Sequence, residues 1–133
     1  MSTIAAHLSK PATSRAPAVA GAIALALVAV VHLLDGPGSL EESSAIGLLE
    51  LALAAAAVPL ALGLVVSPVR DVWIAAGALS VVALGFYLAS RTVGLFGSTD
   101  DIGNWFTTLG VLNVVSELTV IGLAANAVFR RQG

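Results

Sequence analysis

The sequence predicts an all-α integral membrane protein built as a bundle of four transmembrane helices. Hydrophobic residues occupy 58% of the 133 positions and charged residues only 11%, whereas charged residues make up about a quarter of a typical soluble domain. The apolar residues also fall into four blocks, each close to the ~20 residues that a helix needs to cross about 30 Å of hydrocarbon. A soluble domain of this length could not bury so much apolar surface.

The four blocks divide the chain into a tail and one transmembrane domain. Residues 1–15 are polar and have no sustained period, which is typical of a flexible cytoplasmic tail. Residues 16–133 then form a single four-helix domain. We predict spans at about 16–34, 45–66, 72–89 and 105–129.

Two local signals set the boundary between the first two spans. Pro37, between Gly36 and Gly38, is expected to end the first span because proline cannot donate a helical hydrogen bond. Ser43 or Ser44 is expected to cap the second span, since a serine hydroxyl can accept a hydrogen bond from a free N–H group of the first helical turn.

The basic residues predict the orientation of the bundle. Short loops that carry Lys and Arg stay on the cytoplasmic side of a membrane. With both termini cytoplasmic, only Arg91 lies outside, and the other five basic residues lie inside: Lys10, Arg15, Arg70, Arg130 and Arg131. We therefore expect a multi-pass protein of the inner (plasma) membrane with both termini in the cytoplasm.

Five polar residues within or beside the spans are candidates for binding a ligand or an ion: His32, Glu50, Tyr87, Arg91 and Glu117. Ionisable groups inside a membrane are costly and usually face the bundle interior with a partner. Counted from the predicted span ends, His32 lies ~3 Å and Glu50 ~8 Å below the outer surface, near Tyr87 and Arg91, whereas Glu117 lies ~18 Å deep. The sequence thus predicts one outer polar layer and a separate, deeper Glu117.

Composition excludes several kinds of chemistry. Because the chain has no cysteine, it has no disulfide, thiolate metal site or thiol nucleophile. A net charge of -2 gives no reason to expect nucleic acid as a partner. No serine lies in a nucleophile motif such as G-x-S-x-G or S-x-x-K. His32 lacks a second axial ligand for haem, so we expect neither an enzyme nor a cofactor.

The order of polar residues resembles a family of small four-span membrane proteins common in actinobacteria. The matching features are His32, Glu41, Glu42, Gly47, Glu50, residues 87–95, Trp105 and Glu117. Among these features, only the segment Ser-Arg-Thr-Val-Gly-Leu is specific to that family. Family members often have Gly-Leu-Pro-Gly where this chain has residues 94–97, which leaves the shape of that turn open. The family has no assigned activity, so the resemblance implies a topology and a bacterial origin.

These residues support three functional hypotheses. The first is a non-enzymatic accessory or packing subunit, or a binder of lipid or another apolar ligand, with a polar extracytoplasmic mouth; its partners are membrane lipid, other membrane subunits or a second copy. The alternative is proton or cation handling through Glu117, Glu50 and His32. A metal centre at His32 is the second alternative, although neither glutamate has a histidine one turn away, as di-iron bundles require.

Overall fold

A computed structural model describes residues 15–130 and confirms the all-α four-helix bundle. The helices are α2 (Arg15–Glu42), α3 (Ser44–Val66), α4 (Arg70–Thr92) and α5 (Thr108–Arg130). All four are long and apolar enough to cross a membrane. A 23-residue helix spans ~35 Å, which matches the hydrocarbon thickness of a bilayer. The predicted tail lies outside the described residues, apart from Arg15, which begins α2.

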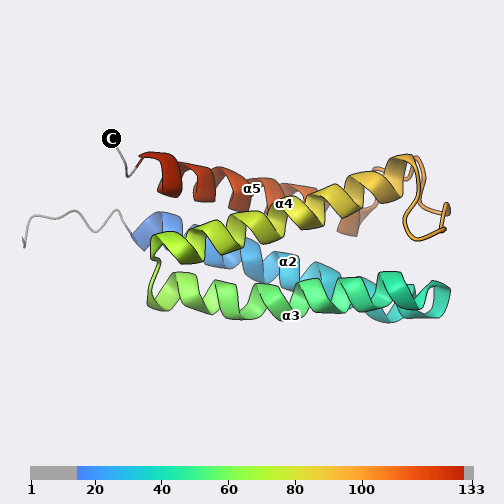
Figure 1. Ribbon diagram of the computed structural model, residues 1–133, viewed down its shortest axis with the longest axis horizontal. Coiled ribbons are helices and arrows are strands. Elements are labelled where there is room, and N and C mark those ends of the chain that lie inside the picture. The colour runs from blue at the N-terminus through green and yellow to red at the C-terminus, as the bar shows by residue number, and fades with distance from the viewer. Residues whose placement is uncertain (1–14, 131–133) are drawn as a thin grey trace, which may run out of the picture.

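Successive helices run in opposite directions along the bundle (Figure 1), and the contacts between them form a ring. Helix α2 packs between α3 and α5, and α4 completes the ring by contacting the same two neighbours. The start of α2 and the end of α5 lie at one end of the bundle, here called the terminal end. The opposite end, here called the loop end, holds the α2–α3 turn and residues 93–107.

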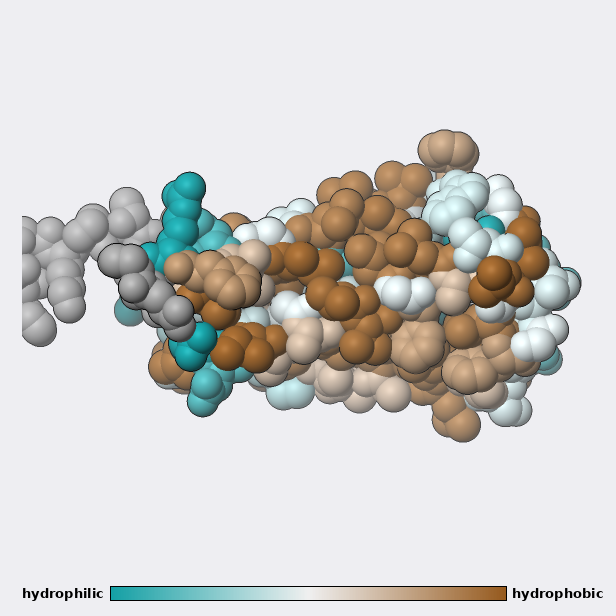
Figure 2. Space-filling view, turned by 45° about the horizontal axis from the view of Figure 1, so that its top comes forward, coloured by the Kyte–Doolittle hydropathy of each residue, from teal (hydrophilic) through white to brown (hydrophobic). Residues whose placement is uncertain are grey.

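An apolar core fills the half of the bundle nearer the terminal end. Its largest buried members include Leu25, Leu64 and Trp73, none more than 2% exposed. Close packing is possible because Gly21 has no side chain: a Cβ there would lie 2.8 Å from the Trp73 ring. On the face shown in Figure 2, the surface is mostly hydrophobic along the middle of the bundle, and the hydrophilic side chains lie toward its ends. This distribution suits helices that face lipid.

Helix α2 does not end where the sequence predicted. The expectation that Pro37 and its glycines stop the helix near Leu34 is wrong, because the helix continues through Pro37 to Glu42. Proline removes only one backbone donor, and neighbouring groups in a membrane bundle compensate for that loss. The extra turns carry α2 further toward the loop end.

Glycines at the loop end act as packing sites between α2 and α3. A Cβ at Gly36 would lie 2.7 Å from Leu51, and a Cβ at Gly47 would lie 2.4 Å from Leu40. These two close approaches hold the last turns of α2 against α3. The glycines therefore allow α2 and α3 to pack closely at the loop end, and they do not terminate a helix.

A single residue, Ser43, connects α2 to α3 and caps the second helix as predicted. Its backbone is extended, with φ at -155°, and its hydroxyl accepts a hydrogen bond from the Ile46 amide at 3.4 Å. The tight connection brings the end of α2 next to the start of α3, and these two helices form the most extensive contact in the bundle.

The connection from α4 to α5 contains a two-residue turn. Leu95 and Ser98 exchange backbone hydrogen bonds of 3.0 and 2.9 Å. Between them, Phe96 has φ of 49° and Gly97 has φ of 83°, the pattern of a type I′ turn. Proline fixes φ near -65°, so it does not fit at position 96 of this turn.

Replacing Gly47 by alanine tests the helix contact. The new methyl would meet both the side chain and the backbone Cα of Leu40, the latter at 2.6 Å, so we expect a loss of about 1–3 kcal/mol in the free energy of unfolding. Unfolding by SDS in mixed micelles measures the change. Gly38→Ala is the matched control, since no atom lies within 4 Å of the position that its new methyl would take. Equal stability of the two variants would contradict the close contact.

Candidate functional site

The loop end encloses a cavity of about 480 Å³, a size typical of small-molecule sites. Residues from all four helices and the α4–α5 loop line it. Four of the five candidates from the sequence share this cavity: His32, Glu50, Tyr87 and Arg91. The exposed side chain of Glu42 also borders it, so the cavity opens at the loop end.

The His32 ring joins two glutamates from two other helices. Its Nδ1 contacts Glu50 Oε2, and its Nε2 lies 3.4 Å from Glu117 Oε1. The three side chains come from α2, α3 and α5. Their exposure falls along the chain of contacts, from 21% for Glu50 to 5% for His32 and 0% for Glu117. We call these residues the His–Glu–Glu triad.

The contact between His32 and Glu117 shows that the predicted depth of Glu117 is wrong. The expectation of a separate, deeper layer is wrong because two helix ends differ from the predicted span ends. Helix α2 continues ten residues beyond His32, which places the ring ~15 Å from that helix end. Helix α5 begins at Thr108, so Glu117 is only nine residues, or ~14 Å, from its start. The two side chains therefore lie at the same level.

The triad has the composition of a proton-binding network. An imidazolium can donate one hydrogen bond to each carboxylate, whereas a neutral ring donates from one nitrogen and accepts from a protonated carboxyl at the other. Both arrangements hold two protons for three groups. A further proton fits on a carboxylate oxygen that has no partner. Glu117 Oε2 is such an atom, since it is buried and makes no hydrogen bond to the described residues.

Two polar residues near the triad were not among the predicted candidates. Asp35 lies three residues after His32 on α2, and it lines the cavity. Asn113 lies four residues before Glu117 on α5; it is 4% exposed and also lines the cavity. Spacings of three and four residues place side chains on one helical face. That periodicity, counted from His32 and Glu117, is the signal that could have identified both.

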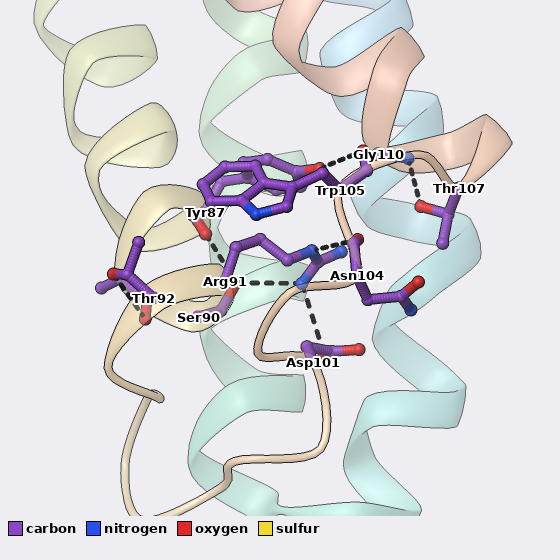
Figure 3. A network of polar contacts seen from close by, with 10 residues as sticks. Tyr87, Ser90, Arg91, Thr92, Asp101, Asn104, Trp105, Thr107 and Gly110 are labelled. Carbon is purple, nitrogen blue, oxygen red and sulfur yellow. Dashed lines mark hydrogen bonds and ion pairs between the residues drawn. The ribbon is translucent and has the colours of Figure 1, made fainter.

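Arg91 organises the mouth of the cavity (Figure 3). Its Nε donates to the Asn104 carbonyl at 2.8 Å, and its Nη1 donates to Ser90 Oγ at 3.0 Å. The same nitrogen lies 3.4 Å from Asp101 Oδ2. The guanidinium carbon also stacks 4.4 Å above the centroid of the Tyr87 ring. One side chain thus attaches the α4–α5 loop to the end of α4.

Tyr87 makes the second attachment between α4 and the loop. Its hydroxyl donates to the Trp105 carbonyl at 3.2 Å, and the two rings meet edge to face with centroids 6.1 Å apart. Thr107 then caps α5 by accepting a hydrogen bond from the Gly110 amide at 3.0 Å. Tyr87 and Arg91 therefore shape the cavity, and neither contacts the triad through a hydrogen bond of the described residues.

The geometry at His32 bears on the metal hypothesis. Residues 15–130 contain no group of three or more His, Asp or Glu side chains placed to hold a metal ion. Both ring nitrogens of His32 face carboxyl oxygens. Metal binding at this ring would have to replace one of the two contacts between a ring nitrogen and a carboxyl oxygen.

Arg91→Lys tests how the loop is attached. An ammonium group cannot reproduce the planar fork that reaches Asn104, Ser90 and Asp101 together. We expect a local loss of about 1 kcal/mol, seen as roughly fivefold faster hydrogen exchange over residues 93–107. Arg70→Lys, at the opposite end of α4, is the control. Unchanged exchange in the loop of Arg91→Lys would show that the guanidinium contacts do not hold it.

Comparison of the chain with protein-family models, with curated proteins and with solved structures finds no match. The resemblance to actinobacterial four-span proteins stays a prediction.

Proposed function

We propose that this chain is a non-enzymatic integral membrane protein that takes up protons from one side of the membrane through its His–Glu–Glu triad. The observation that supports this function is the imidazole of His32, which contacts a carboxyl group on each side. An imidazole can accept a proton at one ring nitrogen and release one from the other, so it can relay protons between the two glutamates.

The decrease in exposure along the triad supplies a direction. Glu50 lines the cavity and is 21% exposed, so its carboxyl can exchange protons with water. A proton accepted by Glu50 passes to Nδ1 of His32, while the proton on Nε2 passes to Glu117. Each step moves one proton between adjacent groups, and the last acceptor is completely buried.

The apolar core limits the relay to one side in this conformation. Beyond Glu117 on α5, Val120 and Ala124 are buried against the core residues Leu25 and Val28. Hydrocarbon side chains offer no group that accepts a proton. A proton on Glu117 therefore returns the way it came, unless the bundle changes conformation. Access from one side only is expected of a proton sensor. It is also expected of one conformational state of a proton-coupled carrier.

The charged groups that line the cavity come from α2, α3, α4 and the α4–α5 loop. Asp35 on α2 lies one turn from His32, and Glu50 on α3 is itself a member of the triad. Arg91 on α4 lines the same cavity, with Asp101 of the loop beside it. The excess of basic residues at the terminal end favours a cytoplasmic position for that end. The cavity then faces outward from the plasma membrane.

An accessory role is the second candidate, and one feature favours it. Helices α2 and α3 border an apolar groove of about 500 Å³ with many small residues, among them Ala29, Ala54 and Ala61. Small residues at a helix surface let a lipid chain or another helix approach closely. In this role the triad would only fix the three helices together.

Glu117→Gln separates the proton relay from a structural role. The amide keeps an acceptor oxygen for the His32 ring but cannot take up a proton, so we expect this variant to bind fewer protons than the wild type when a weakly buffered micelle solution is acidified, as measured by a pH-sensitive dye in that solution. The unfolding free energy changes by less than about 1 kcal/mol. Glu117→Leu removes the acceptor and loses about 1–2 kcal/mol in addition.

Asp100→Asn is the control for proton uptake, because Asp100 is exposed and lies outside the cavity. Proton uptake by Glu117→Gln equal to that of the wild type would reject the relay, as would a wild-type protein that takes up no protons.

A further inference from the structure

The α4–α5 loop carries four apolar side chains that the rest of the described chain leaves largely uncovered. Val93 is 79% exposed, Phe96 58%, Ile102 44% and Phe106 93%. Phe106 is the most exposed large hydrophobic side chain of residues 15–130. Leaving one such side chain in water forgoes about 1.5–3 kcal/mol of burial free energy. Four of them in one short loop indicate that another surface covers the loop.

Phe106 does not pack on the helix that follows it. Thr107 caps α5, since its hydroxyl accepts a hydrogen bond from the Gly110 amide and its carbonyl accepts one from the Val111 amide. An apolar residue directly before a cap often packs against the fourth residue of the helix, which is Val111 here. At 93% exposure Phe106 makes no such contact, and Val111 is itself 44% exposed. The Phe106 ring therefore projects away from the bundle.

Phe96 lies beside α4, although it follows that helix in the sequence. The ring centroids of Phe96 and Phe86 are 6.4 Å apart. Phe86 lies six residues before the end of α4 at Thr92, which is ~9 Å from that end. The two-residue turn thus directs the Phe96 ring back along the helix, toward the middle of the bundle.

The cavity does not account for the exposed side chains. The loop residues that line the cavity are Leu95, Ser98, Asp101, Asn104 and Thr107, and none of the four exposed apolar residues is among them. A ligand in the cavity would leave all four uncovered. The loop therefore has one side that borders the cavity and a separate set of apolar side chains.

The distance of the loop from the helix ends identifies the covering surface. A 23-residue helix is ~35 Å long, whereas the hydrocarbon is about 30 Å thick and the headgroup layers add roughly 5–8 Å on each side. Helices centred on the bilayer thus end ~3 Å inside the headgroup layer. Val93 directly follows α4, and Phe106 lies two residues before α5. Both fall within the headgroup layer, where aromatic side chains are enriched.

We propose that the α4–α5 loop lies in the headgroup layer of the bilayer that holds the bundle, with Phe96 and Phe106 inserted among the lipids. The partner of this surface is membrane lipid, at the boundary between head groups and acyl chains. The anchoring goes beyond proton uptake and does not depend on it, because neither phenylalanine lines the cavity. Arg91 holds the loop to α4, so the loop is attached to the bundle and to lipid at once.

Spin labels at single cysteines test the depth of the loop. Because the chain has no cysteine, each label has one position. Phe106→Cys, Phe96→Cys and Asp100→Cys each receive a nitroxide, in phosphatidylcholine nanodiscs that hold one copy of the full chain. Power-saturation electron paramagnetic resonance compares access of O₂, which concentrates in lipid, with access of nickel ethylenediaminediacetate, which stays in water. We expect the O₂-to-nickel ratio to be roughly threefold or more higher at positions 96 and 106 than at position 100.

Two further variants complete the experiment. Val115→Cys is the lipid control, since Val115 is 58% exposed on α5 and lies ~10 Å inward from the start of that helix; its ratio exceeds that at position 106. Phe106 has so few contacts that Phe106→Cys keeps the fold. If Phe96→Cys does not fold, Val93→Cys takes its place, because Val93 is 79% exposed.

Two results would overturn the proposal. Equal ratios at positions 96, 106 and 100 would show that the aromatic side chains lie in water, where a partner protein would have to cover them. Exclusion of both reagents from position 106 would show that protein buries the label, even with one copy in each disc. A high ratio at positions 96 and 106, between the ratios at 100 and 115, supports insertion into lipid.

Discussion

The contact of one imidazole with two glutamates is the interaction on which the loop half of the bundle depends. Ionisable side chains within a membrane span are stable only when they meet partners inside the bundle. His32 supplies two partners at once, because its ring nitrogens point in different directions toward Glu50 and Glu117. Three helices are therefore joined at one level by a ring that is only 5% exposed. Hydrocarbon packing alone would not define that level.

The same four helices form two different environments along their length. Toward the terminal end, small and branched apolar residues such as Ala76 and Val120 pack without exposure to solvent. Toward the loop end, polar residues replace them and the helices enclose the cavity. The triad lies at the boundary between these environments. This position makes its innermost group inaccessible from the terminal end, and it gives its outermost group contact with the cavity.

Helix α4 contributes to the site in another way. It adds no member to the triad, but its last turns carry Tyr87 and Arg91, which attach the α4–α5 loop through Trp105, Asn104 and Asp101. The loop in turn completes the wall of the cavity. By pairing with Asp101, Arg91 also leaves Asp35 and Glu42 without a basic partner among the described residues.

The sequence alone determined the four helices and most of the residues of the site. Crossing hydrocarbon requires long apolar blocks, and ionisable residues within such blocks are rare enough to identify His32, Glu50 and Glu117 directly. Only the tertiary structure decided which of them meet. Each residue of error in a predicted helix end shifts the predicted depth of a side chain by ~1.5 Å. Helix α2 extends eight residues past the predicted end at Leu34. Close contacts at Gly36 and Gly47 pack the extended part of α2 against α3, and no local pattern around Pro37 reveals them.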